Sequence, residues 1–147
     1  MTTLATIGYE NTTVPRFLET LQDAGVDLLV DVRAVASSRR PGFSKTKLAA
    51  QLTEGGIEYL HLRGLGTPAD GRAAARAGRH EEMRAIFMEH METSEAQDQL
   101  ERLAELVRAG RRVCLLCLEA DPTHCHRSMV AEALQELMPV QVQNLAP

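Results

Sequence analysis

Short apolar runs alternate along the chain with amphipathic stretches of helical period, and this alternation restricts the fold more than any other feature of the sequence. Runs of this kind lie at residues 4–8, 26–32, 57–62 and 112–118, and they are predicted to be strands. Strands of a parallel sheet read as nearly continuous apolar runs because helices cover both faces of the sheet. The sequence therefore predicts a mainly parallel α/β fold.

The stretches between these runs carry signals for the ends of helices. Ser44 is predicted to cap a short helix, and Ser94 with Gln97 forms a capping box for a longer helix that ends at Gly110. The last helix is followed by a short run at residues 140–142, which is predicted to be an edge strand.

One segment, residues 63–79, is rich in Gly, Ala and Arg and shows no clear period. At this length it is predicted to be a functional loop or a partly mobile one. The chain of 147 residues has room for one hydrophobic core. We therefore expect residues 1–147 to form a single three-layer α/β domain with a mainly parallel sheet of about five strands.

The overall composition is that of a globular protein, with 44% apolar and 24% charged residues. No window approaches the run of about 18 apolar residues that a membrane span needs, and the N-terminus lacks the basic start and apolar core of a signal peptide. We expect a soluble cytoplasmic protein with no membrane partner. The net charge of −4 does not favour nucleic-acid binding through bulk positive charge, although a local basic site stays open.

Three cysteines, Cys114, Cys117 and Cys125, lie close together in the sequence. Their odd number, in a chain expected to be intracellular, argues against a disulfide framework. Cys114 lies deep in an apolar run and is predicted to be a buried core thiol. The other two flank the start of a predicted helix, whose backbone N–H groups and dipole favour an anion or a thiolate. Cys117 or Cys125, and not Cys114, is therefore expected to be the reactive thiol.

The start of that helix has two interpretations. It begins near Cys125, which then benefits from the helix dipole, or Asp121 and Pro122 cap it earlier and leave Cys125 about one turn inside. Arg127 and Ser128 follow directly and offer a guanidinium fork and a hydroxyl to an oxyanion.

Other polar residues follow the ends of the remaining predicted strands. In parallel α/β folds, ligands bind beyond the carboxyl ends of the strands, so these residues are expected to gather at one edge. Residues 33–53 contain five basic and no acidic residues, although the whole chain is acidic. We expect Arg39, Arg40 and Arg127 to lie on one face and to bind an oxyanion. The ligand-binding candidates are Tyr9, Arg33, Ser38, Arg39, Arg40, His61, Arg127 and Ser128.

These groups indicate a function in which a small anionic molecule, such as a phosphate or nucleotide compound, binds beside a thiol. Cys117 or Cys125 would act as nucleophile or redox centre, and Glu119 or His126 would carry a proton. The sequence does not decide whether the protein is an enzyme. The alternatives are a non-catalytic module whose basic loop binds a nucleic-acid backbone or an acidic protein, and a metal-bound regulator.

Metal binding is the least favoured of these alternatives. Zinc and iron ligands are present among Cys117, Glu119, His124, Cys125 and His126. Their spacing argues against a site, since no Cys-x-x-Cys pair is accompanied by a second knuckle and adjacent residues entering a helix point in different directions. We expect no bound metal and no cofactor; phosphate-loop and dinucleotide-binding glycine motifs are also absent from the sequence.

Four segments of the chain carry a family resemblance. They are Thr6–Tyr9, Leu29–Arg33, Ser38–Phe43 and Leu116–Ser128. On these motifs the chain resembles the family known as domain of unknown function 488. The resemblance spans nearly the whole chain and implies a small α/β domain in which the motifs form one site, but it supplies no reaction.

A weaker resemblance is to rhodanese-like sulfurtransferases, in which a strand ending Asp-Val-Arg precedes a strand ending in cysteine and a helix that begins with Arg-Ser. Cys117, Arg127 and Ser128 match this pattern. The interval from Cys117 to Arg127 is longer than the compact cradle loop of those enzymes. The resemblance therefore concerns architecture and does not assign persulfide chemistry to Cys117.

Overall fold

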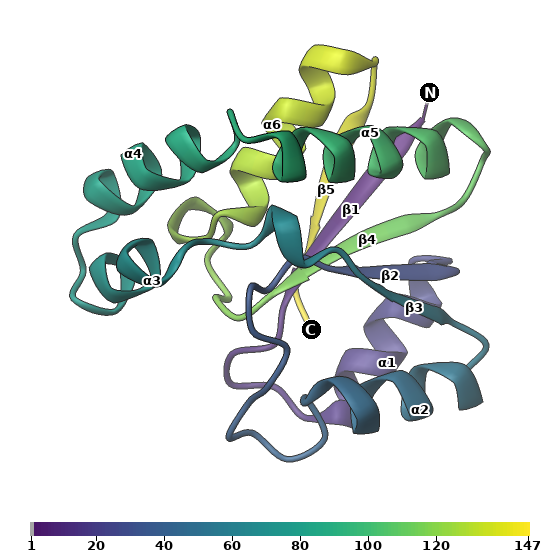
Figure 1. Cartoon of the computed structure of the whole chain (residues 1–147). Coiled ribbons are helices and arrows are strands. Elements are labelled where there is room, and N and C mark those ends of the chain that lie inside the picture. Colours follow the sequence, from purple (N-terminus) through teal and green to yellow (C-terminus); the bar gives the residue numbers. More distant parts are fainter. Residues whose placement is uncertain (1) are drawn as a thin grey trace.

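A computed structural model describes residues 2–147, and a five-stranded sheet forms their centre (Figure 1). The strands are ordered β3-β2-β4-β1-β5, and every neighbouring pair is parallel. The predicted edge strand at residues 140–142 belongs to β5, which does lie at an edge. The strands are β1 (Thr3–Gly8), β2 (Leu28–Asp31), β3 (Glu58–His61), β4 (Val113–Cys117) and β5 (Gln141–Leu145).

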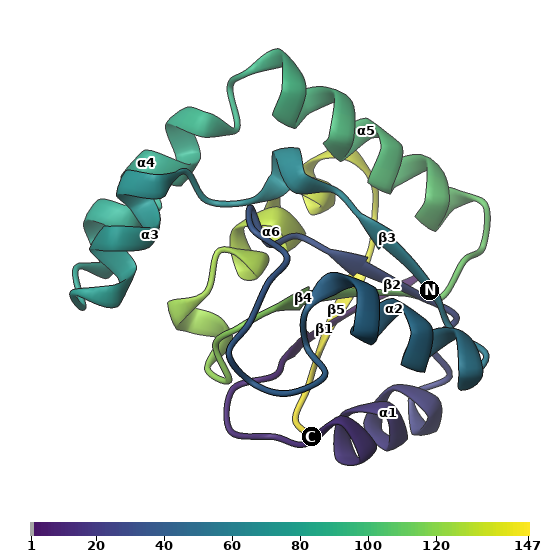
Figure 2. The ribbon, with the colours of Figure 1, turned by 60° about the horizontal axis from the view of Figure 1, so that its bottom comes forward.

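Helices cover both faces of the sheet, which confirms the predicted α/β class. Figure 2 shows α1 and α2 on one side, α5 and α6 on the other, and α3 with α4 extending outward beside α6. None of the helices within residues 2–147 combines the length and apolar character that crossing a bilayer demands. The helices are α1 (Val14–Asp23), α2 (Lys45–Glu54), α3 (Ala69–Arg76), α4 (His80–His90), α5 (Ser94–Arg108) and α6 (Arg127–Leu137).

The core has two parts, one on each face of the sheet, and β4 contributes to both. Val113 and Leu115 pack on the side of α5 and α6, whereas Cys114 and Leu116 pack on the side of α1 and α2. Side chains alternate between the two faces of a strand, so Cys117 returns to the α6 side. Cys114 is fully buried in the core, as predicted.

Two local predictions need correction. Residues 63–79 do not form a long loop: a single 3₁₀ turn and the helix α3 occupy most of the segment, because its Ala-rich stretch favours a helix and Gly71 and Ala74 bury one side of it. The N-cap of α5 is Thr93, whose hydroxyl accepts a hydrogen bond from the Ala96 amide, and not Ser94. Ser44 occupies the predicted N-cap position of α2.

The arrangement of the helices creates a crevice at the carboxyl ends of the central strands. The chain leaves β2 toward α2 on one face, and it leaves the neighbouring strand β4 toward α6 on the opposite face. Ligands of parallel α/β folds bind where neighbouring strands diverge in this way. The register places Gly8 of β1 beside Cys117 of β4, so three central strands end next to one another at this crevice.

Candidate functional site

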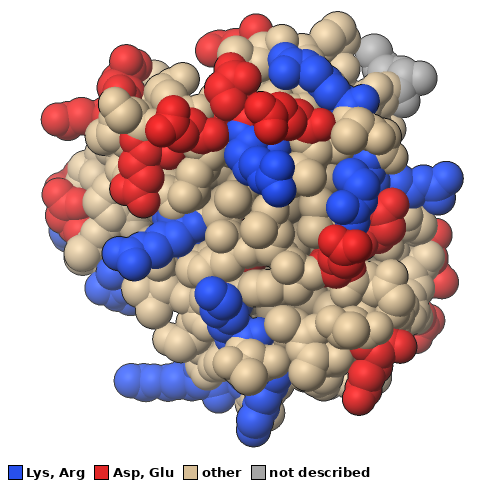
Figure 3. All heavy atoms as spheres, turned by 45° about the vertical axis from the view of Figure 1, so that its right-hand side comes forward, with Lys and Arg blue, Asp and Glu red and all other residues tan. Residues whose placement is uncertain are grey.

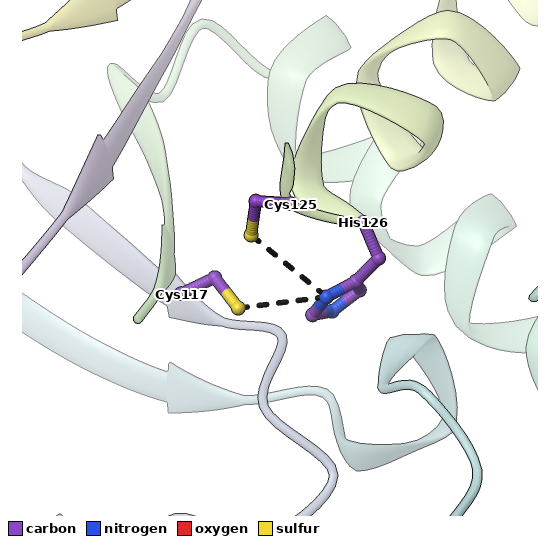
Figure 4. Close-up of side chains that lie close together, drawn as sticks. All are labelled: Cys117, Cys125 and His126. Carbon is purple, nitrogen blue, oxygen red and sulfur yellow. Dashed lines mark hydrogen bonds between the residues drawn. The ribbon is translucent and has the colours of Figure 1, made fainter. Parts of the chain in front are cut away.

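Two cysteines and a histidine meet at the end of β4, as Figure 4 shows. Nδ1 of His126 lies 3.4 Å from Sγ of Cys117 and 3.9 Å from Sγ of Cys125. The three donor atoms lie within 4.8 Å of one another, and all three residues are buried. We call these residues the thiol–imidazole cluster. Three of the four predicted catalytic candidates thus lie together.

The imidazole of the cluster is held by the backbone of the neighbouring strand. Nε2 of His126 lies 2.7 Å from the carbonyl oxygen of Val32. A carbonyl only accepts hydrogen bonds, so Nε2 carries a hydrogen, and in the neutral imidazole the lone pair is on Nδ1. This lone pair faces the two sulfur atoms. The cluster therefore has a defined tautomer and a defined orientation.

The loop before α6 shows where the helix starts. Asp121 caps a single 3₁₀ turn at Pro122–His124, and its carboxylate accepts a hydrogen bond from the Thr123 amide. The α-helix itself begins at Arg127, with His126 at the N-cap position. Asp121 and Pro122 therefore open a separate turn, and the cluster lies immediately before the α-helix.

Arg127 lies inside the protein and not on the surface where it was expected. Its side chain is fully buried, and its two Nη atoms donate to the carbonyls of Glu119 and Ala120 at 2.5 and 3.4 Å. Ser128 likewise donates to the Pro122 carbonyl at 2.5 Å. The expected exposed face shared by Arg127, Arg39 and Arg40 does not form, because Arg127 cross-links the loop from within.

A glycine at the end of β1 allows this loop to lie close to the sheet. A Cβ on Gly8 would lie 1.9 Å from the carbonyl oxygen of Glu119 and 3.0 Å from Nη1 of Arg127. No side chain fits at that distance from a backbone oxygen. Gly8 is therefore part of the same packing arrangement that holds Arg127 and the loop.

A buried ion pair holds the end of β2. Nε and Nη2 of Arg33 donate to the Asp31 carboxylate at 2.9 and 2.8 Å, and the Tyr59 hydroxyl donates to the same group at 2.5 Å. Burial alone would lower the pKa of Arg33, but the hydrogen bonds and charge of Asp31 raise it. Burial and the hydrogen bond to Asp31 raise the pKa of Tyr59. Arg33 therefore stays charged.

This ion pair fixes the backbone that orients two histidines. The Val32 carbonyl accepts from His126, and the next carbonyl, that of Arg33, accepts from Nε2 of His61 at 2.7 Å. His61 thus contacts the backbone of the site and does not line its cavity. Asp31 lies in a strand-end segment that the sequence marks as unusual, but it was not among the ligand-binding candidates, and neither was Tyr59. Asp31 bonds to Arg33 directly, and Tyr59 bonds to Asp31.

A cavity of about 280 Å³ lies in front of the cluster. Cys117 and His126 form part of its wall, but Cys125 lies behind them and does not line it. Two arginines from α3, Arg72 and Arg76, face the same cavity and were missed because their segment was interpreted as a loop. Their four-residue spacing, typical of one face of a helix, was the signal that could have found them. The predicted candidates that line the cavity are Tyr9, Arg33, Cys117, Glu119 and His126.

The basic part of the loop that follows Arg33 does not reach this cavity, although Ala34, Val35 and Ser37 of the same loop line it. Ser38, Arg39 and Arg40 line a separate depression of about 440 Å³, together with Lys45 and Lys47. The Arg40 guanidinium donates to the Thr12 carbonyl, and the Ser44 hydroxyl donates to the Ser38 carbonyl. Of the eight predicted ligand-binding residues, two therefore line the cavity, three line the depression, and His61, Arg127 and Ser128 line neither.

The thiols of the cluster titrate together. The hydrogen bond with Cys125, together with burial, raises the pKa of Cys117 well above its ordinary value. Burial alone would raise the pKa of Cys125, but the hydrogen bonds with Cys117 and His126 and the charges of His126 and Arg127 lower it. The cluster therefore favours one negative charge shared by the two sulfur atoms. In contrast, burial raises the pKa of Cys114 and keeps it a thiol.

The neighbouring thiols and burial also shift the pKa values of His126 and Glu119. Burial would lower the pKa of His126, but the hydrogen bond and charge of Cys125 raise it. Burial raises the pKa of Glu119 to about 7. One oxygen of this carboxyl lies 3.5 Å from Sγ of Cys117. Groups that exchange protons near neutral pH thus surround the sulfur that lines the cavity.

A family model described as "Domain of unknown function DUF488" matches residues 13–134, which is most of the chain. The chain belongs to this family. The matched range includes the whole thiol–imidazole cluster, and it confirms the resemblance seen in the sequence motifs. No curated protein and no solved structure matches the chain, so the similarity to rhodanese-like enzymes gains no support. The family's description gives no activity, and function has to be argued from the site.

Proposed function

We propose that the protein is an enzyme that binds a small anionic molecule in the cavity and reacts with it through Cys117. One observation carries this proposal. The only one of the three cysteines that lines the cavity lies 3.4 Å from an imidazole nitrogen that is oriented by a backbone carbonyl. A nucleophile, a base and a group that orients the base are the parts that covalent catalysis needs.

The reaction step follows from the positions of these atoms. The proton of the Cys117 thiol passes to Nδ1 of His126, and the sulfur then attacks an electrophilic atom of the bound molecule. The bond between that atom and its leaving group breaks, and the imidazolium returns the proton to the leaving group. The resulting imidazolium keeps its hydrogen bond to the Val32 carbonyl through Nε2, so the ring does not need to turn. The Glu119 carboxyl, 3.5 Å from the same sulfur, is a second group through which a proton can leave.

The charges around the cavity favour an anion. Asp31 neutralises Arg33, but within residues 2–147 no carboxylate lies within ion-pair distance of Arg72 or Arg76. Both arginines line the cavity, and Nη1 of Arg72 also donates to the Thr67 carbonyl at 2.9 Å. Its volume is near the lower end of the range of about 300–1,000 Å³ for small-molecule sites. We therefore expect a compact phosphate or carboxylate compound as substrate.

The experiment measures how fast each cysteine reacts with iodoacetamide in the metal-free, reduced protein, by mass spectrometry of its peptides. Cys117 is expected to react faster than Cys114, and inorganic phosphate at millimolar concentration is expected to slow Cys117 alone. The Cys114→Ser variant is the matched control and should show the same protection. Equal rates at Cys117 and Cys114, or no effect of phosphate on Cys117, would contradict the proposal.

A second candidate function rests on the separate basic depression. Its lining includes Ser38, Arg39, Arg40, Lys45 and Lys47. Of the four cations among them, Arg39, Lys45 and Lys47 are exposed. Figure 3 shows that charge on the molecule is unevenly distributed: the lower left of that face carries Lys and Arg, while Asp and Glu gather at its upper left and right. Binding of a nucleic-acid backbone at the depression would weaken steeply with salt and would be lost in Arg39→Ala with Cys117 unaffected.

A further inference from the structure

The nucleophilic role proposed for Cys117 leaves Cys125 without a function. Cys125 is buried, does not line the cavity, and yet its sulfur lies 3.9 Å from Nδ1 of His126. The same nitrogen is 3.4 Å from the sulfur of Cys117. Two sulfur atoms and one nitrogen lone pair thus converge on a common point, which is more than a nucleophile and its base require.

The spacing of these atoms fits a tetrahedral metal ion. Zinc binds sulfur at about 2.3 Å and imidazole nitrogen at about 2.0–2.1 Å, so a tetrahedral ion separates a sulfur from a nitrogen ligand by about 3.6 Å. The two observed separations, 3.4 and 3.9 Å, lie on either side of that value. Small side-chain movements are therefore enough to bring all three atoms to bonding distance of one ion.

The surroundings of His126 also match those of a metal ligand. Metal-bound histidines almost always donate their other ring N–H to a carboxylate, a backbone carbonyl or water, and this bond fixes which nitrogen faces the ion. The bond from Nε2 to the Val32 carbonyl does the same here and leaves Nδ1 directed at the two sulfurs. This bond crosses between segments far apart in the sequence, so the orientation is built into the fold.

We propose that Cys117, Cys125 and His126 bind a thiophilic divalent cation of the Zn²⁺ type, with the fourth coordination position open to the cavity. Three protein ligands and one open position are typical of metal sites at which a small molecule binds. The ion forms bonds to two sulfurs and to Nδ1, and each thiol that is still protonated releases its proton to solvent. Two thiolates balance the charge of the ion, so the buried site becomes neutral.

This inference rests on the proposed function for one point only, that the cavity in front of Cys117 is the site of reaction. The metal uses the lone pairs of the Cys117 sulfur and of Nδ1 that the nucleophilic step needs. The metal-bound form and the free-thiol form therefore exclude each other, and the cation regulates the thiol. An anion held by Arg72 or Arg76 would border the open coordination position.

The expectation of no metal rested on Cys125 and His126 both entering the helix and so pointing apart, and the backbone differs from that premise. Cys125 has an extended conformation (φ −122°, ψ 141°), and only His126 is helical (φ −63°, ψ −16°). The change of conformation between the two residues lets their adjacent side chains meet, and Cys117 joins them from β4.

The test uses the full chain without a polyhistidine tag, reduced and stripped of metal with a chelator, and then titrated with Co²⁺ as a spectroscopic probe for Zn²⁺. We expect one equivalent to bind, with thiolate-to-cobalt charge-transfer bands and the visible bands of a tetrahedral ion. Zn²⁺ should displace Co²⁺. Cys125→Ser should weaken binding by at least about 100-fold, since it removes one ligand. Cys114→Ser, which alters a cysteine outside the cluster, should bind like the unaltered chain.

Several results would overturn the metal proposal. They are binding of well under one equivalent, an octahedral spectrum without sulfur bands, or equal affinity in Cys125→Ser. The spectrum of the unaltered chain decides even if a variant does not fold. Alkylation separates this proposal from the proposed function. If phosphate protects Cys117 but the chain binds no Co²⁺, only the metal proposal is overturned. If the chain binds tetrahedral Co²⁺ but Cys117 does not react in the metal-free form, only the nucleophilic role of Cys117 is overturned.

Discussion

The loops that follow β2 and β4 leave the same edge of the sheet from neighbouring strands, but they place their charged and reactive residues very differently. The loop after β4 returns on itself and brings Cys125 and His126 back to Cys117. The loop after β2 keeps only its first arginine, Arg33, at the cavity, while Arg39 and Arg40 lie in another depression. Only one of the two loops therefore concentrates its polar groups at one point.

The difference comes from what each loop is bonded to. Two side chains from α6 donate to the carbonyls of the loop after β4: Arg127, which is buried, and Ser128, which is half-buried. The outer part of the loop after β2 is bonded to itself through Ser38 and Ser44, and its one bond to the loop before α1 is the one from Arg40 to the Thr12 carbonyl. The sheet determines the positions of the first residues after each strand. The position of a loop tip is determined instead by the hydrogen bonds that the loop itself makes.

The largest effect is expected from removing the charge that anchors the loop after β2. Asp31→Asn preserves the shape of the side chain but leaves the buried Arg33 guanidinium without its carboxylate partner. Breaking a buried ion pair in this way costs about 3–5 kcal/mol of unfolding free energy. Urea denaturation followed by circular dichroism measures the loss. A loss below about 1 kcal/mol would mean that Arg33 finds another partner, and the ion pair would not hold this loop.

A somewhat smaller loss is expected for the anchor of the loop after β4. Arg127→Ala removes the donors to the Glu119 and Ala120 carbonyls and leaves a cavity in a fully buried place. We expect the unfolding free energy to fall by about 2–4 kcal/mol. The same denaturation measurement checks this value. If the variant were as stable as the unaltered chain, the loop would be held by other contacts and the comparison of the two loops would fail.

A third prediction concerns the cavity and not the stability of the fold. Arg76 is exposed, lines the cavity and comes from neither of the two loops. Arg76→Ala is expected to weaken the protection of Cys117 by phosphate about tenfold, since a hydrogen bond to a charged group contributes about 1.5–3 kcal/mol. Alkylation rates across a phosphate titration give the affinity. Unaltered protection would remove α3 from the anion site.

The smallest effect is expected for the outer part of the loop after β2. Arg39 is exposed and lies in the separate depression. Arg39→Ala should change the unfolding free energy by less than about 0.5 kcal/mol and should leave phosphate protection of Cys117 unchanged. It is the matched control for Arg76→Ala. A loss of protection equal to that in Arg76→Ala would show that both depressions belong to one site.

The sequence predicted the sheet well because its central strands β1, β2 and β4 are nearly continuous apolar runs, and their burial leaves little room for another arrangement. It also identified Cys117, Glu119 and His126 as neighbours of the cavity, since the ends of parallel strands share one edge. It did not predict α3, because the Ala-rich stretch between residues 69 and 76 has helix propensity but contains no apolar residue larger than alanine.

The sequence did not predict the direction in which individual side chains point. Arg127 was expected at the surface because an arginine at a helix start is usually exposed. Its guanidinium is instead buried and donates to two loop carbonyls. The convergence of Cys125 and His126 depends on one extended residue before the helix, a backbone detail that no residue pattern marks. Contacts between loops and single backbone angles therefore set the parts of the site that sequence reasoning missed.

The most direct test of the central claim, that Cys117 and His126 act as a pair, is the alkylation rate of Cys117 in metal-free His126→Gln compared with the unaltered chain. The amide of Gln keeps a donor near the Val32 carbonyl but has no basic nitrogen to take the thiol proton. With Cys114 in the same sample as the internal reference, the Cys117 rate is expected to fall at least about tenfold. An unchanged ratio of the Cys117 and Cys114 rates would contradict the account, because the imidazole 3.4 Å from the sulfur would then do nothing for its reactivity.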